Sequence, residues 1–234
     1  MLKVKMGQYS GSDNLEVMLS ALNYNQYLLN LISRFVGNSS KIVDFGAGIG
    51  TFAKAMRNNG YPVNCIEPDK LQSKIIENQG ISVIPLLGSI GQNRVDYLYS
   101  LNVLEHIEDD QSILKEIYLS LVPGGHALIY VPAFEILFSS MDRKVGHFRR
   151  YTKKDLTEKL IKANFIIKKA RYVDCLGFFA SLAFRFLGNR SGAIGIRSVY
   201  IYDRIIFPIS RLFDRFFQYF LGKNVWVLAQ KPVN

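Results

Sequence analysis

The sequence contains few residues of the types that form disulfides or metal sites, with 2 cysteines and 3 histidines among 234 residues. Cys65 lies in a predicted buried strand and Cys175 lies far from it along the chain. We therefore expect two reduced thiols that pack in the interior rather than a disulfide. The histidines and cysteines do not cluster at the spacing of a metal-binding motif, so we predict no structural or catalytic metal.

Long apolar runs are also missing. The first twenty residues are polar and carry Asp13 and Glu16, which argues against a secretory signal and leads us to expect a cytoplasmic protein. The apolar stretch 176–187 is too short to span a membrane. A second stretch, 199–221, carries five charged side chains, which also disfavours a membrane span.

Positive charge is concentrated in the C-terminal part. Residues 1–140 contain 10 basic and 13 acidic side chains, whereas residues 141–234 contain 19 basic and 6 acidic ones. This asymmetry suggests an anionic partner for the C-terminal part, namely a phosphorylated substrate, an anionic membrane surface or nucleic acid. Nucleic acid is not expected, because the region lacks glycine-interleaved basic motifs and a recognition module.

Hydrophobic periodicity predicts a single α/β domain. One or two helices within 14–36 precede an alternation of strands and helices. The predicted strands are 41–45, 63–66, 81–84, 95–101, 126–132, 165–173 and 224–230. The predicted helices that follow strands are 51–59, 70–78, 109–121 and 153–163.

A glycine turn directly follows the first predicted strand, in the segment 43–50. Gly46 and Gly48 allow positive φ angles and a close approach of the backbone to a ligand, and Asp44 ends the strand with a carboxylate. The spacing is GxGxG rather than GxGxxG, which disfavours a nicotinamide-dependent oxidoreductase.

Three further blocks follow in order. Glu67 ends the second strand, where a carboxylate can accept hydrogen bonds from ribose hydroxyls. Residues 102–108 (NVLEHIE) follow the fourth strand, and residues 121–129 combine a helix exit, a Pro-Gly-Gly turn and an apolar strand. Over about residues 24–173, these blocks resemble the class I S-adenosylmethionine-dependent methyltransferases. The resemblance implies a doubly wound, mostly parallel seven-stranded sheet whose last two strands are antiparallel.

The resemblance also implies S-adenosylmethionine as the cofactor, with a set of contacts: Asp44, Gly46, Ala47 and Gly48 for the methionine part, Glu67 for the ribose hydroxyls, and Asn102 beneath the methionine. Many relatives bind the adenine amino group with an acidic residue after the third strand. This chain has Ser89 and Ile90 there, and we expect the Ser89 hydroxyl and the Ile90 backbone to replace the acid.

A narrower resemblance involves Tyr24-Asn25, 102–106, 131–133 and 142–151. These segments resemble a bacterial subgroup of methyltransferases that occurs beside or fused to glycosyltransferases in surface-polysaccharide and glycolipid pathways. This resemblance does not fix a substrate, and the acceptor that we expect is an anionic or lipid-linked small molecule or saccharide. The residues we expect to bind it are Tyr24, Asp142, Arg149, Arg150 and Tyr151.

The segment 142–151 offers two kinds of chemistry. Arg149 and Arg150 can grip a phosphate through their paired donors. In the alternative, one arginine pairs with Asp142 or Glu135 to fix the loop and the other is solvated.

Histidine supplies the candidate general bases. His147 is the first choice, because neutral imidazole can take a hydroxyl proton near pH 7. A structural hydrogen bond is its alternative role. His106 is the second candidate, and His126 is expected to be structural.

About fifty residues, 174–222, separate the last two predicted strands, which we interpret as a helical insertion rich in Phe, Ile and Arg. Such a basic amphipathic element fits a membrane interface or the cover of an apolar substrate. Alternatively, it packs on the domain as a lid. Pro208 is expected to kink or divide its helix.

The favoured hypothesis is that the protein transfers a methyl group by direct displacement to an oxygen of a glycan, a lipid-linked saccharide or a related acceptor. We expect the protein to be peripheral at the inner face of the plasma membrane. Alignment of the reactants would supply much of the catalysis. The alternatives are methylation of a soluble metabolite or a quinone-like lipid, nucleic-acid binding, and cofactor binding without catalysis.

Overall fold

The structure is a computed structural model that describes residues 19–187 and 195–233. Its strands form one seven-stranded sheet: β1 (Ile42–Phe45), β2 (Val63–Ile66), β3 (Val83–Ile84), β4 (Val95–Leu101), β5 (Leu121–Pro132), β6 (Ile166–Val173) and β7 (Asn224–Gln230). The strand order is β3-β2-β1-β4-β5-β7-β6. β1 to β5 pair in parallel, and β7 is antiparallel to both of its neighbours. The predicted sheet is confirmed.

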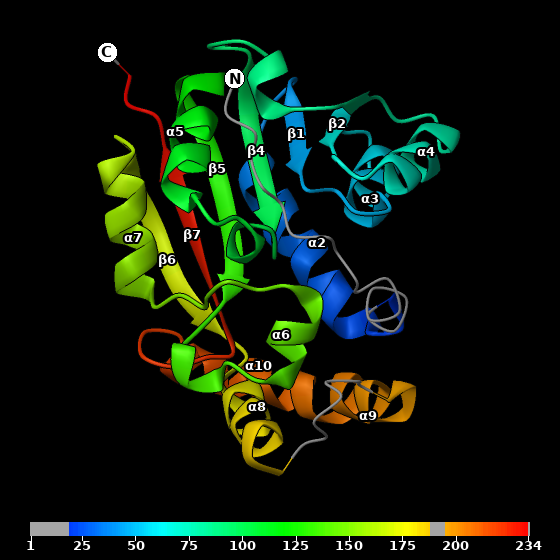
Figure 1. The fold of residues 1–234 in the computed structure, drawn as a ribbon, viewed down its shortest axis with the longest axis vertical. Helices are drawn as coiled ribbons and strands as arrows, with labels where there is room; N and C mark the ends of the chain where they lie inside the picture. The colour runs from blue at the N-terminus through cyan, green and yellow to red at the C-terminus, as the bar shows by residue number, and fades with distance from the viewer. Residues whose placement is uncertain (1–18, 188–194, 234) are drawn as a thin grey trace.

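Helices cover both faces of this sheet and one of its ends (Figure 1). They are α2 (Leu22–Val36), α3 (Thr51–Asn58), α4 (Lys70–Asn78), α5 (Asp110–Ser120), α6 (Ser140–Val145), α7 (Lys153–Lys162), α8 (Cys175–Leu187), α9 (Ile196–Ile201) and α10 (Phe207–Phe217). Short helical turns are η1 (Leu87–Ser89), η2 (Leu104–His106), η3 (Glu135–Leu137) and the π-helical turn η4 (Tyr202–Ile206).

Alternation along the strands divides the interior into two cores. On β5, Ile129 and Val131 belong to the core that contains α5 and α7, whereas Leu128 and Tyr130 belong to the core that contains α2 and α3. Because side chains alternate between the two faces of a strand, each central strand contributes to both cores. The chain order of the strands reverses between β1 and β4, where doubly wound sheets bind their ligands.

Two boundaries differ from those expected. β5 begins at Leu121, because Leu121 already pairs with Val95, and a register shift then accommodates the Pro-Gly-Gly turn inside the strand. The stretch 199–221 forms α9, η4 and α10 in succession, with Pro208 in the first turn of α10, directly after the π-helical turn η4. The predicted helix start at residue 14 lies outside the described residues.

Both cysteines, Cys65 and Cys175, are buried and free, as predicted.

The insertion between β6 and β7 turns its carboxylates and the Ser210 hydroxyl inward. Asp214 on α10 accepts hydrogen bonds from the backbone N–H groups of Asp174 and Cys175, both at 2.9 Å, at the start of α8. The Ser210 hydroxyl accepts one from the N–H of Leu176 at 3.0 Å. A carboxylate and a hydroxyl of α10 thus satisfy N–H groups at the start of α8 that have no intrahelical partner.

The outward face of the same insertion is apolar. More than half of the exposed large hydrophobic side chains of the described residues belong to it, namely Phe179, Phe186, Ile196, Tyr200, Ile201, Ile205, Ile209, Leu212, Phe213, Phe216, Phe217, Tyr219 and Phe220. We call this set the outer apolar face. In Figure 1, α8, α9 and α10 lie together at the end of the sheet toward which β1 and β5 point. No helix in residues 19–187 or 195–233 has the length and apolar character needed to cross a membrane.

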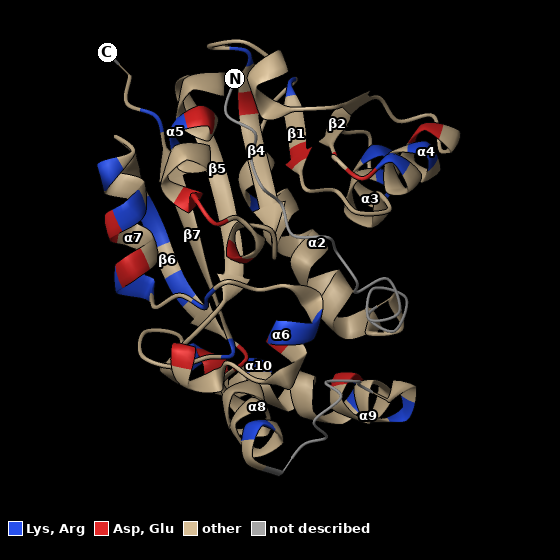
Figure 2. Ribbon diagram, viewed as in Figure 1, with Lys and Arg blue, Asp and Glu red and all other residues tan. Residues whose placement is uncertain are grey.

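Much of the positive charge lies along the outermost strand of the sheet (Figure 2). Lys168, Lys169 and Arg171 on β6 lie beside Lys153 and Lys154 of α7. β6 has only β7 as a neighbour, and lysines on such an edge strand hinder pairing with another chain. This placement explains part of the basic character without an anionic partner.

Candidate functional site

The glycine turn after β1 is anchored to the end of β2. Gly46, Gly48 and Gly50 have φ angles of 77°, 58° and 80°. The N–H groups of Gly46 and Ala47 donate to the Ile66 carbonyl at 2.8 and 3.1 Å. A Cβ on Gly46 would lie 2.4 Å from the Val103 side chain, whereas one on Gly48 would meet only Gln72, at 3.6 Å. Position 46 therefore requires glycine because a side chain would clash with Val103. Next to Gly48, the surface of the turn is open to a ligand.

Glu67 lies against this turn. Its carboxylate accepts hydrogen bonds from the N–H of Gly48 at 2.8 Å and the N–H of Asp69 at 3.0 Å. The residue is buried, and burial raises the pKa of its carboxyl group. Two backbone donors fix the carboxylate while each oxygen keeps a lone pair, as the capture of ribose hydroxyls requires.

Asp44 is the second carboxylate on this side. Burial raises the pKa of Asp44 to about 7, and the negative charge of nearby Glu67 adds to the increase. A positively charged ligand would relieve this cost, because it favours the ionised form. The predicted position of Asp44 at the charged end of the cofactor is consistent with this electrostatic state.

Asn102 follows β4 with a left-handed φ angle of 55°, and its N–H donates to the Tyr130 carbonyl at 2.8 Å. The Tyr24 hydroxyl lies within hydrogen-bonding reach of the Asn102 side chain and donates to the Tyr130 hydroxyl at 3.2 Å. Burial raises the pKa of Tyr24 to about 12, so this phenol stays protonated. The fold thus brings together Tyr24 and Asn102, which the sequence separates widely.

Tyr24 owes its position to the insertion. The buried Asp203 carboxylate in η4 accepts from the N–H of Asn23 at 2.9 Å and the N–H of Tyr24 at 2.8 Å. It satisfies the free N–H groups of the first turn of α2 and favours the positive end of the helix dipole. Sequence reasoning missed this residue, because its only signal was an acidic position within an apolar stretch.

Ser89 and Ile90 lie at the end of η1. Their N–H groups donate to the carbonyls of Leu86 and Leu87, both at 3.1 Å. The Ile90 N–H is therefore used in the turn, while the Ser89 side chain is exposed. The expected adenine contact stays a prediction, better suited to the Ser89 hydroxyl than to the Ile90 N–H.

Asp142 organises the loop after β5. It accepts from the N–H of Ser139 at 2.8 Å and from Nε and Nη2 of Arg150 at 2.8 and 2.9 Å, and its Oδ1 lies 2.7 Å from His147 Nδ1. Burial alone would raise the pKa of Asp142, but the hydrogen bonds from His147 and Arg150 outweigh it and hold the pKa well below its usual range.

The two arginines are both ion-paired. Arg150 pairs with Asp142, which matches the alternative in which an arginine fixes the loop. Arg149 is not solvated as that alternative expected, because Nη1 lies 2.9 Å from Asp110 Oδ2 and Nη2 donates to the Glu108 carbonyl. Phosphate binding by either arginine stays a prediction.

Tyr151 supports the site rather than lining it. It is buried, and its hydroxyl donates to Asp110 at 2.9 Å and lies 3.2 Å from the Leu104 carbonyl. Both partners belong to the protein interior beside β4. The expected contact of Tyr151 with substrate stays a prediction, which its buried and hydrogen-bonded hydroxyl disfavours.

Glu105, His106 and His147 form a cluster beside these residues. One ligand-type atom of each lies within 4.8 Å of the others. The His106 and His147 rings meet edge to face, with centroids 4.6 Å apart. Burial raises the pKa of Glu105 to about 7, and burial together with the neighbouring His147 lowers that of His106 to about 4. The predicted bases are thus adjacent, while His126 lies on β5 opposite Gln230 of β7, away from them.

The sequence prediction missed this grouping because residues 105–106 and 147 are far apart along the chain. The available signal was that both segments follow neighbouring parallel strands, β4 and β5, whose carboxyl ends meet at one edge of the sheet.

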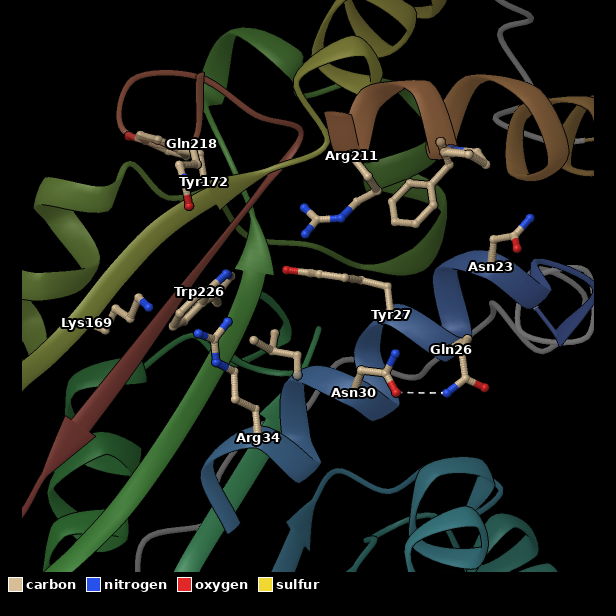
Figure 3. A pocket seen from close by; sticks show the side chains of 13 residues that line it. Asn23, Gln26, Tyr27, Asn30, Arg34, Lys169, Tyr172, Arg211, Gln218 and Trp226 are labelled. Carbon is tan, nitrogen blue, oxygen red and sulfur yellow. Dashed lines mark hydrogen bonds between the residues drawn. The ribbon is translucent and has the colours of Figure 1, made fainter. Parts of the chain in front are cut away.

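A separate cavity of about 520 Å³ lies between α2, α10 and the strands β6 and β7 (Figure 3). Arg34, Lys169 and Arg211 line it together with aromatic side chains such as Tyr27 and Trp226. None of the site residues predicted from the sequence lines this cavity.

Comparison with known proteins gives three kinds of match. A family profile described as a methyltransferase domain matches residues 20–169. The ubiquinone biosynthesis O-methyltransferase of Rickettsia felis is 30% identical over an alignment of 116 residues that covers 44% of this chain and 47% of that protein. The chain thus matches about half the length of this curated relative.

Two solved structures share the fold. An S-adenosylmethionine-dependent methyltransferase of Thermotoga maritima matches with a TM-score of 0.63 at 16% identity, covering 94% of each chain. Phosphoethanolamine N-methyltransferase 2 of Haemonchus contortus, solved with S-adenosyl-L-methionine, matches with a TM-score of 0.59 at 17% identity, covering 88% of this chain and 52% of that one.

Proposed function

The chain belongs to the methyltransferase-domain family. From this premise we propose that it is an S-adenosylmethionine-dependent methyltransferase that methylates a hydroxyl of a lipid-borne acceptor, first of all a lipid-linked saccharide, at the inner face of the plasma membrane. The outer apolar face carries this proposal, because it lies on the insertion that also positions Tyr24. Methylation of a quinone-like lipid is the second candidate, favoured by the similarity to the Rickettsia felis enzyme.

The residues present fit the cofactor. Gly48 leaves open space beside the turn, and the fixed carboxylate of Glu67 keeps lone pairs for two hydroxyls. The buried Asp44 gains from a nearby positive charge. We therefore assign Gly46, Ala47 and Gly48 with Asp44 to the methionine part and Glu67 to the ribose.

The cofactor supplies a methyl group on a positively charged sulfur, which leaves as a neutral thioether. The chain's own contribution is to align the acceptor oxygen with this methyl group. Tyr24 lies within hydrogen-bonding reach of Asn102 and near the charge of Glu105, and Val103, which follows Asn102, packs against Gly46 of the glycine turn. We assign the acceptor hydroxyl to the vicinity of these residues, with the cluster of Glu105, His106 and His147 activating it. The general-base role of His147 stays a prediction.

The outer apolar face suits a membrane interface. Fully burying one phenylalanine side chain stabilises association by about 1.5–3 kcal/mol. Basic side chains such as Arg197, Arg204 and Arg215 lie among its apolar ones, which favours an anionic lipid surface.

Vesicle flotation tests the membrane part of the proposal. Wild type should float with vesicles of phosphatidylethanolamine and phosphatidylglycerol. A Phe216→Glu, Phe220→Glu variant should bind them at least tenfold more weakly, because it loses the burial of two phenylalanines. Leu71→Glu is a matched control, since Leu71 on α4 is 75% exposed, as is Phe216. A wild type that stays with the soluble fraction would contradict the membrane part.

Transfer of labelled methyl groups tests the acceptor class. We expect product with a lipid-linked saccharide fraction and none with the same saccharides released from their lipid. Labelling of a demethylated quinone instead would favour the second candidate. Labelling of soluble metabolites alone would contradict a lipid-borne acceptor.

A further inference from the structure

The cluster of Glu105, His106 and His147 has the composition of a metal centre. We propose that these three side chains bind one divalent transition-metal ion of the zinc type beside the acceptor position. Metal binding itself is independent of the proposed function, whereas the catalytic role given to the ion below rests on it.

Glu105 has an unsatisfied carboxylate. Its side chain is 0% exposed, and neither Oε1 nor Oε2 has a hydrogen-bond partner in the described part of the chain. Leaving a buried carboxylate without a partner is costly, so the site calls for a cation or a donor. His147 Nε2 lies 3.8 Å from Oε1, which is too long for a hydrogen bond.

The tautomer of His147 sharpens this argument. Asp142 already accepts from Arg150 and Ser139, so it acts as an acceptor toward His147 Nδ1, and the Nδ1 atom carries the proton. In the neutral ring Nε2 then presents a lone pair. A nitrogen lone pair and a carboxylate oxygen of Glu105 therefore face each other across 3.8 Å, and either a proton or a metal cation is needed between them.

No neighbouring arginine fills this gap. Arg150 uses Nε and Nη2 on Asp142 and Nη1 on the Ala133 carbonyl.

Both histidines are oriented as metal ligands usually are. Asp142 holds Nδ1 of His147, and the backbone carbonyls of Gly146 and Val145 lie within hydrogen-bonding reach of the His106 ring. Such partners fix the ring and the tautomer in metal sites. The loop is itself tied to the cluster, because the Phe148 N–H donates to the Glu105 carbonyl at 2.8 Å.

Two imidazoles with one carboxylate favour zinc, manganese, iron or cobalt over magnesium or calcium, which prefer oxygen ligands. Three protein ligands leave a position open for the acceptor oxygen. Coordination there lowers the pKa of the hydroxyl, whose proton passes to water. The oxygen then bonds to the methyl carbon as the carbon–sulfur bond breaks, and the bonding pair stays on sulfur.

Metal binding and proton abstraction by His147 are alternatives, because the same Nε2 lone pair cannot do both. Titration of the untagged full chain, stripped with a chelator, with Co²⁺ and Zn²⁺ separates them. We expect one ion per chain and a visible cobalt absorption typical of nitrogen and oxygen ligands. Glu105→Gln and His147→Ala should weaken binding at least tenfold, and Asp142→Asn by about 10–100-fold.

His126→Ala is the matched control, because it removes the third histidine and leaves the cluster intact. It should bind the ions as wild type does. S-adenosylmethionine binding by every variant reports that the fold and the cofactor site are intact, and therefore separates failure of the metal site from failure of the proposed function.

Absence of stoichiometric binding by wild type would overturn the proposal, as would equal affinity in Glu105→Gln and His147→Ala. Full methyl transfer by the stripped protein would overturn the catalytic role of the ion.

Discussion

The clearest test of the cofactor site is replacement of Glu67 by alanine. The carboxylate accepts from the N–H groups of Gly48 and Asp69, and it is the group we assign to the ribose hydroxyls. A hydrogen bond to a charged group contributes about 1.5–3 kcal/mol, so loss of two such bonds to the ribose should cost about 3–6 kcal/mol of binding free energy. This corresponds to an affinity loss of at least about a hundredfold.

Calorimetry with S-adenosylmethionine provides the measurement. The Glu67→Ala variant should show no saturable binding at concentrations that saturate wild type, while Glu77→Ala, an exposed position on α4, should bind normally. Thermal unfolding of each variant shows whether the protein is folded, because the substitution also leaves the Gly48 and Asp69 N–H groups without a partner. An affinity within a factor of three of wild type in a folded Glu67→Ala protein would refute this assignment of the ribose site.

Three further predictions concern other parts of the structure. The pKa of Asp44 is about 7 in the cofactor-free protein, and a positively charged ligand lowers it. Binding of S-adenosylmethionine should therefore release protons near pH 7, and its affinity should weaken as the pH falls below 7. Calorimetry in buffers of different ionisation enthalpy measures the proton release, and a pH-independent affinity would contradict this prediction. Asp203→Ala should lower the unfolding free energy by about 1–3 kcal/mol, because two partly buried N–H groups of α2 lose their acceptor. Chemical denaturation measures this change, and unchanged stability would contradict the anchoring of Tyr24 by the insertion. Gly46→Ala should destabilise the protein and abolish cofactor binding, because the added Cβ would lie 2.4 Å from the Val103 side chain and the φ angle of residue 46, 77°, is strained for alanine. A stable variant with normal cofactor binding would refute this packing argument.

Local patterns were sufficient for most of the fold. Apolar runs of strand length, glycine stops and capping residues predicted the order of the strands and helices within a few residues. The largest exceptions lie where tertiary pairing decides the boundary. β5 starts at Leu121 because Val95 is available to pair with it, and no local pattern contains that information.

The residues on the cofactor side of the site could be predicted from the sequence for the same reason. Asp44, the glycine turn and Glu67 follow directly from two consecutive strands, so short-range spacing places them at one edge of the sheet. The acceptor side depends on longer-range packing. Whether Arg150 faces a ligand or Asp142 could not be read from their positions in the chain, because the ion pair forms only when the loop after β5 folds back.

The sequence by itself determined the α/β architecture, the position of the glycine turn and the acidic residue after β2, because these depend on periodicity and on backbone conformations that particular residues favour. The tertiary structure alone decided three other features. It placed Glu105 and His106 beside His147, it turned the carboxylates of the insertion inward to hold α2 and α8, and it left the phenylalanines of α10 exposed. Each of these depends on contacts between segments that are distant in the chain, whose burial and charge balance exist only once the helices and strands have packed together.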